Sequence, residues 1–135
     1  MGWLRTVGAV VAGFLAMGLA VAGSMAVAMA LMGIRDVSAP PSTVFAGVLT
    51  VLSLICGIVG GSVCAWVAGR AHPRATLMLA IVVGALGVWE AVTAPPAPND
   101  WHMWTVTAAG VIGVLAGSFF WTRGLKARSD APRPM

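Results

Sequence analysis

Three polar residues with chemically useful side chains lie close together in the sequence, beside two tryptophans. Glu90 and Asp100 supply carboxylates and His102 supplies an imidazole, next to Trp101 and Trp104. Carboxylates and an imidazole that meet in space can bind a divalent cation or pass a proton. The spacing of Glu90, Asp100 and His102 matches no metal-ligand motif. We therefore treat them as a candidate polar site and predict neither a bound metal nor another cofactor.

The other reactive side chains are two cysteines, Cys56 and Cys64, in a single apolar segment. Eight residues along a helix separate the two positions by about 12 Å, which is too far for a disulfide. We interpret both as small packing residues. No nucleophile in the sequence is paired with a base, so we predict no enzymatic activity and no catalytic residue.

The composition indicates a membrane protein. Of the 135 residues, 59% are hydrophobic and 9% are charged, whereas about 25% of the residues of a soluble domain are charged. About 20 helical residues cross a hydrocarbon core of about 30 Å, where each helix satisfies its own backbone hydrogen bonds. The apolar runs lack the alternation of barrel strands. We predict an all-α integral membrane protein with a single domain, a bundle of four transmembrane helices.

Four apolar segments correspond to the predicted helices. They are residues 6–33, 44–69, 75–94 and 104–121, and a polar, basic tail follows over residues 122–135. We expect this tail to be weakly structured. Ser42 or Thr43 is expected to cap the second helix, because a hydroxyl can accept a hydrogen bond from the first turn. The first segment is much longer than the apolar core of a signal peptide, so we predict an uncleaved helix.

The basic residues predict the orientation of the chain, because Lys and Arg beside transmembrane helices stay on the cytoplasmic side. With the turn "GRAHPR" inside, both termini lie inside as well. The inner side then holds seven of the eight basic residues and one of the four acids. The predicted inner anchors, which also suit anionic lipids, are Arg5, Arg70, Arg74, Arg123, Lys126, Arg128 and Arg133.

This charge distribution explains the net charge of +4 without nucleic-acid binding. The tryptophans agree with it, because they fall near both predicted interfaces, as amphipathic rings do. The high content of Ala, Gly, Val and Arg is typical of a GC-rich bacterial genome. We predict a multi-pass protein of the bacterial inner membrane with both termini in the cytoplasm.

Small residues recur at a spacing of four in three of the segments. In lipid, helices associate through close backbone contact at small residues, and residues four apart are neighbours on a helix surface. The predicted helix-packing positions are Gly8, Ala12, Ala16, Ala20, Ser24 and Ala28 in the first segment, Gly57, Gly61, Ala65 and Gly69 in the second, and Ala109, Gly113 and Gly117 in the fourth.

The sequence has many small residues suited to helix packing and few side chains suited to catalysis or ligand binding, which favours a structural role. We predict a small accessory subunit of a larger membrane complex, which contacts other subunits, or copies of itself, through its small-residue faces. The alternative is a homo-oligomeric small transporter or channel that uses Glu90, since an ionisable residue within a transmembrane segment is a functional candidate by default. Hydroxyls of Ser53, Ser62, Thr107 and Ser118 would then line the path.

Overall fold

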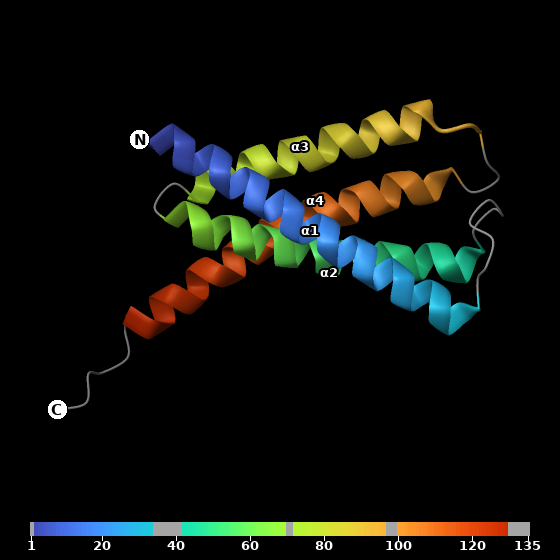
Figure 1. Ribbon diagram of the computed structural model, residues 1–135, viewed down its shortest axis with the longest axis horizontal. Helices are drawn as coiled ribbons and strands as arrows, with labels where there is room; N and C mark the ends of the chain where they lie inside the picture. Colours follow the sequence, from blue (N-terminus) through green and yellow to red (C-terminus); the bar gives the residue numbers. More distant parts are fainter. Residues whose placement is uncertain (1, 34–41, 70–71, 97–99, 130–135) are drawn as a thin grey trace.

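All four predicted helices form in the computed structural model (Figure 1). It describes residues 2–33, 42–69, 72–96 and 100–129, without the side chains of residues 72, 125 and 127–129. The helices are α1 (Gly2–Met32), α2 (Thr43–Ala68), α3 (His72–Thr93) and α4 (Trp101–Ser129). Each contains a stretch that is long and apolar enough to cross a membrane. This confirms the prediction of an all-helical chain with four helices of membrane-spanning length and composition.

The sequence at both ends of α2 explains its bounds. Ser42 caps the helix as predicted, because its Oγ accepts a hydrogen bond of 3.2 Å from the backbone N–H of Phe45. At the other end, Gly69 has a φ of 59°, a conformation that glycine adopts without steric cost. Pro73 then lies in the first turn of α3, where a missing N–H breaks no helical hydrogen bond. The chain therefore reverses direction abruptly.

Helix α4 is longer than predicted. It continues to Ser129, so the prediction of a weakly structured tail is wrong over residues 122–129. The first proline of the tail is Pro132, and the residues before it include the strong helix formers Leu125, Lys126 and Ala127. Basic residues in the last turns of a helix also interact favourably with its dipole. The composition of the tail suggested disorder, but its helix propensity favours an extension of α4.

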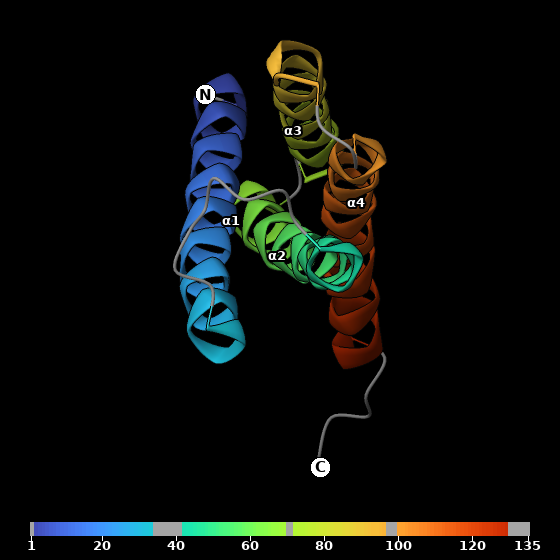
Figure 2. The ribbon, with the colours of Figure 1, turned by 90° about the vertical axis from the view of Figure 1, so that its right-hand side faces the viewer.

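The helices alternate in direction along the bundle (Figure 1). The start of α1, the end of α2, the start of α3 and the end of α4 therefore lie at the same end of the bundle, where the last turns of α4 extend away from the other helices (Figures 1 and 2). We call this the basic end, because the described basic residues near it are Arg5, Arg74, Arg123 and Lys126. The opposite end is the acidic end, where Glu90 lies near the end of α3 and Asp100 precedes α4.

Helix α2 is the centre of the bundle. It contacts all three other helices, whereas the backbones of α1 and α4 do not meet within the described residues. Figure 2 shows α2 between them. The buried core contains residues of all four helices and lies toward the basic end of α1, α2 and α3: Ala9, Cys64, Ala68, Ala75, Leu79, Ala80 and Val114.

Glycines bring the backbones of these helices into direct contact. A Cβ on Gly57 of α2 would stand 3.0 Å from the Cα of Gly113 on α4, and a Cβ on Gly61 would overlap the backbone of Val114. On the other side of α2, a Cβ on Gly60 would stand 3.0 Å from the carbonyl oxygen of Gly13 on α1. Such close approach gives helices in lipid their van der Waals attraction.

Candidate functional site

A groove of about 500 Å³ opens between α1 and α3 toward the acidic end. The two helices are close near the basic end, where a Cβ on Gly13 would stand 2.9 Å from Cδ2 of Leu79. They diverge from there along the bundle (Figure 1). The groove is lined by Phe14, Met17, Gly18, Val21, Ala22 and Met25 of α1, Val83, Leu86, Gly87 and Glu90 of α3, Val106, Thr107 and Gly110 of α4, and Ser53 of α2.

The lining residues of α1 and of α3 recur every three or four positions. This spacing places each set on one face of its helix. Large apolar side chains alternate there with glycine and alanine, so the walls are apolar and leave room between them. The groove is therefore a consequence of the divergence of α1 and α3 combined with small residues on both facing surfaces.

Three polar side chains lie along this groove. The Ser53 hydroxyl donates a hydrogen bond of 2.9 Å to the carbonyl oxygen of Val106, and the Thr107 hydroxyl donates one of 2.8 Å to that of Met103. Among the described residues that line the groove, Glu90 is the only charged one. Within the described part of the chain, no side chain forms a hydrogen bond or ion pair with its carboxylate. The groove thus presents one unmatched negative charge.

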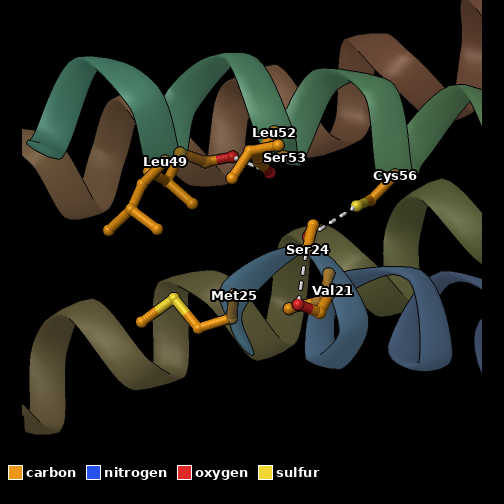
Figure 3. Close-up of a pocket in the computed structure, with 8 residues that line it drawn as sticks. Val21, Ser24, Met25, Leu49, Leu52, Ser53 and Cys56 are labelled. Carbon is orange, nitrogen blue, oxygen red and sulfur yellow. Dashed lines mark hydrogen bonds between the residues drawn. The ribbon is translucent and has the colours of Figure 1, made fainter. Parts of the chain in front are cut away.

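A smaller pocket of about 110 Å³ extends from the groove between α1 and α2 (Figure 3). It shares Val21, Met25, Ser53 and Val106 with the groove. Ser24 and Cys56 close it at one side, with their Oγ and Sγ atoms 3.7 Å apart. The Ser24 hydroxyl also donates a hydrogen bond of 3.1 Å to the carbonyl oxygen of Val21. Both polar side chains are thereby engaged in the packing of α1 on α2.

The two cysteines are placed as packing residues. Cys56 and Cys64 are buried, and neither is part of a disulfide. Cys64 lies beside Gly13 of α1, where a Cβ on the glycine would stand 2.8 Å from the Cβ of Cys64. Both side chains fill space between α2 and α1.

The candidate polar site is only partly assembled. Glu90 lines the groove, whereas Asp100 and His102, at the start of α4, are not among the residues that line it. Over the described ranges, no three His, Cys, Asp or Glu side chains are grouped so that they could hold a metal ion. The structure instead brings Glu90 together with Ser53 and Thr107.

Four of the small residues predicted to pack α2 and α4, namely Gly57, Gly61, Gly113 and Gly117, lie in the interface between these helices. Five of the seven positions are glycines, and only Gly69, at the end of α2, is exposed. A Cβ on Gly117 would overlap the backbone of Ile58, and one on Gly113 would overlap the carbonyl oxygen of Leu54. The buried positions are Gly57, Gly61, Ala65, Ala109, Gly113 and Gly117.

The predicted small-residue row on α1 is less buried than the predicted positions on α2 and α4. Gly8 is exposed and has open space around it, Ala28 is buried, and Ala12, Ala16, Ala20 and Ser24 between them are half-buried. Each step of four residues advances about 40° around a helix of 3.6 residues per turn, so five steps turn through about 200°. The row therefore passes from the exposed side of α1 to its buried side.

A second row of small residues on α1 was not predicted from the sequence. Gly18, Ala22, Ala26 and Ala30 are spaced four apart and are all exposed. A Cβ on Gly18 would meet nothing within 4 Å. The same spacing rule that identified the row from Gly8 would have found this one. We call Gly18, Ala22, Ala26 and Ala30 the exposed small row.

The predicted basic anchors have individual surroundings. The Nε of Arg5 donates a hydrogen bond of 3.1 Å to the carbonyl oxygen of Val67, in the last turn of α2. The guanidinium carbon of Arg123 lies 4.4 Å from the centre of the Phe119 ring. The side chain of Arg74 is exposed. Lys126 is exposed on α4, whereas Arg70, Arg133 and the side chain of Arg128 lie outside the described residues.

Comparison of the chain with protein-family models, curated proteins and solved structures finds no match. The function is therefore inferred from the surfaces of the molecule. Two of them remain without a counterpart in the described chain: the exposed small row on α1, and the apolar groove with its carboxylate, which share Gly18 and Ala22. A carboxylate beside an apolar groove is suited to a ligand with an apolar part and a cationic part.

Proposed function

We propose that the protein is a small accessory subunit of a larger complex in the bacterial inner membrane. In this proposal the four helices each cross the bilayer, and the basic end with both termini faces the cytoplasm. The location of Arg5, Arg74, Arg123 and Lys126 on helix ends at the same end of the bundle supports this orientation, because basic residues are retained on the cytoplasmic side. The same residues attract anionic lipid headgroups.

The exposed small row is the observation that most favours an accessory role. In the most apolar stretch of α1 only 11% of the residues are buried, against 33% in α2 and in α4. Small residues on a lipid-facing helix allow a second helix to approach its backbone closely. Large side chains such as Leu15 and Leu19 flank the row and give a partner helix ridges to pack against. The partner is another subunit or a second copy of this chain.

Substitution of Ala26 tests this role. Ala26→Leu fills the middle of the exposed small row with a side chain that meets lipid in the isolated chain. Native electrophoresis of membranes solubilised in mild detergent, with and without covalent cross-linking, then measures the assembly. We expect the wild-type chain to migrate within a larger complex and Ala26→Leu to migrate alone. Ala108→Leu is the matched control, because Ala108 is an exposed alanine on α4 and lies outside the row.

Two results contradict the accessory role. One is a wild-type chain that migrates as a monomer in several mild detergents with no protein cross-linked to it. The other is equal dissociation of the complex by Ala26→Leu and Ala108→Leu, which indicates a general effect of added bulk.

A homo-oligomeric small transporter or channel is the second candidate. It is favoured by the position of Glu90 in the same groove as the hydroxyls of Ser53 and Thr107. Ser62 and Ser118, the other two hydroxyls of the predicted path, bond to neighbouring helices elsewhere in the bundle. Ion or solute flux into proteoliposomes distinguishes the candidates, because Glu90→Gln abolishes flux in a transporter of this kind and leaves an accessory subunit assembled.

A further inference from the structure

The groove between α1 and α3 matches one leaflet of a bilayer in length. Its lining on α1 extends from Phe14 to Met25, a distance of about 17 Å at 1.5 Å per residue. Half of a hydrocarbon core is about 15 Å thick. Glu90 lies on the groove wall within one turn of the end of α3 at Thr93, so its carboxylate is at the level of the headgroups when the apolar part spans the leaflet.

The Glu90 carboxylate has no cationic counterpart nearby in the described chain. The arginine and lysine side chains that the structure describes are Arg5, Arg74, Arg123 and Lys126, which belong to the helix ends at the opposite end of the bundle. His102, at the start of α4, does not line the groove. A cation that pairs with Glu90 is therefore supplied from outside these residues, by a molecule that reaches the acidic end of the groove.

The shape of the groove favours a chain-like occupant. About 500 Å³ is within the range of pockets for small molecules, roughly 300–1,000 Å³. A transmembrane helix is about 10–12 Å across with its side chains and would extend well beyond a groove of this volume. The opening between α1 and α3 also admits a lipid sideways from the bilayer without a path from the water.

The headgroup decides which lipid binds. An acyl chain gains almost nothing by leaving other acyl chains for an apolar groove, because lipid tails are as apolar as the side chains that line it. Selectivity therefore comes from Glu90, and a carboxylate prefers a cationic group that donates hydrogen bonds. A primary ammonium meets this requirement, whereas an anionic glycerol headgroup is repelled.

We propose that the groove binds one acyl chain of an aminophospholipid in the leaflet at the acidic end, with the headgroup ammonium paired to Glu90. Phosphatidylethanolamine has this chemistry. The site requires insertion of the helices in the bilayer. It shares Gly18 and Ala22 with the exposed small row, so the lipid and a partner helix can bind together only when that helix is seated over Ala26 and Ala30.

Photolabelling in nanodiscs tests the site. The full chain is placed in phosphatidylcholine nanodiscs that contain a small fraction of phosphatidylethanolamine or of phosphatidylglycerol, each with a photoreactive group on one acyl chain. Mass spectrometry then locates the label. We expect phosphatidylethanolamine to label α1 between Phe14 and Met25 and α3 between Val83 and Glu90, and to label them more strongly than phosphatidylglycerol. Glu90→Gln should reduce its labelling about fivefold, the upper end for an exposed ion pair.

Two variants distinguish the contribution of the Glu90 charge to lipid labelling from that of the shape of the groove. Asp100→Asn removes the other described acid of the acidic end, which does not line the groove, and should leave the labelling unchanged. Gly18→Leu narrows the groove and keeps Glu90, and a Cβ at this position meets nothing within 4 Å. It should reduce labelling by both lipids while the helical content stays the same.

Three results overturn the proposal. The first is equal labelling of the groove by phosphatidylethanolamine and phosphatidylglycerol in the wild-type chain. The second is labelling by phosphatidylethanolamine that Glu90→Gln leaves intact. The third is a groove that cross-links to a co-purified protein in native membranes, because that result assigns it to a partner helix.

Discussion

Thr76 on α3 donates a hydrogen bond of 3.1 Å from its Oγ1 to the Oγ of Ser118 on α4. Both side chains are buried, so the bond joins two helices in an apolar environment near the basic end. Ser62 of α2 donates chiefly to the carbonyl oxygen of Ile58 in its own helix, at 2.8 Å, and more weakly to that of Gly117, next to Ser118, at 3.3 Å. These hydroxyls fix how far α4 is shifted along its two neighbours.

Removal of the Thr76 hydroxyl should destabilise the bundle modestly. Thr76→Val keeps the size and branching of the side chain and leaves Ser118 without its donor. Hydrogen bonds between helices in membranes contribute about 0.6 kcal/mol on average and at most about 1.7 kcal/mol, so we expect a loss in this range. Titration with a denaturing detergent, followed by circular dichroism, measures the free energy of unfolding.

Thr105→Val is the control for this substitution. Thr105 is exposed, and its hydroxyl donates only to the carbonyl oxygen of His102 in its own helix. Its replacement should change the free energy of unfolding by a few tenths of a kcal/mol at most. Equal losses for Thr76→Val and Thr105→Val would show that the bond to Ser118 contributes nothing specific.

The glycine contacts between α2 and α4 should be the least tolerant positions in the chain. A Cβ on Gly57 would stand 2.5 Å from the carbonyl oxygen of Gly110 and 3.0 Å from the Cα of Gly113. Both are backbone atoms that cannot rotate away. Overpacking of this kind costs about 1–3 kcal/mol, so Gly57→Ala should lower the free energy of unfolding by that amount in the same titration.

Gly8→Ala is the matched glycine substitution. Nothing lies within 4 Å of a Cβ at Gly8, and alanine is about 1 kcal/mol better than glycine in the interior of a helix. We expect Gly8→Ala to be neutral or stabilising. A loss of stability from Gly8→Ala as large as that from Gly57→Ala would contradict the assignment of the close contact to α2 and α4.

The structural features that depend on residues close together in the sequence could be predicted from it. The existence of four helices follows from apolar runs, and the start of α2 follows from the hydroxyl of Ser42 and its bond to Phe45. Long-range geometry was not accessible in this way. The groove exists because α1 and α3 meet near Gly13 and Leu79 and then diverge, and a crossing angle depends on how distant side chains interlock.

The candidate site was predicted only in part, because local signals in the sequence identify single residues but not which distant residues they face. Glu90 was identified because an acid near an apolar segment is unusual, and its type alone makes it conspicuous. Phe14, Met17 and Met25, which line the same groove, come from a helix that lies far away in the sequence and resemble ordinary packing residues. Asp100 and His102 are close to Glu90 in the sequence, but the groove does not include them.

Arg5 should stabilise the end of α2. Its Nε donates to the carbonyl oxygen of Val67, one of the last carbonyls of the helix, which have no partner within the helix itself. A cation near the C-terminus of a helix is favourable by roughly 0.3–1 kcal/mol when it is exposed, as Arg5 is. Arg5→Gln should lower the free energy of unfolding by about 0.5 kcal/mol at low salt.

Arg74→Gln should not lower the free energy of unfolding as Arg5→Gln does. Arg74 is exposed in the first turn of α3, where a positive charge opposes the helix dipole. Its removal should be neutral or slightly stabilising, and both effects should shrink as salt is added, because exposed charges are screened. If Arg5→Gln and Arg74→Gln destabilise equally, the contact between Arg5 and Val67 has no part in stability.

The proposed orientation predicts which thiols a membrane-impermeant reagent reaches. In a chain with Cys56→Ala and Cys64→Ala, Pro96→Cys adds an exposed thiol at the acidic end, and Gly124→Cys adds one at the basic end, where a Cβ meets nothing within 4 Å. Neither substitution changes the charge that directs insertion. In intact spheroplasts we expect the reagent to label Pro96→Cys and to leave Gly124→Cys unmodified until the membrane is permeabilised. Labelling of Gly124→Cys before permeabilisation would reverse the orientation, and labelling of both from outside would exclude four complete crossings.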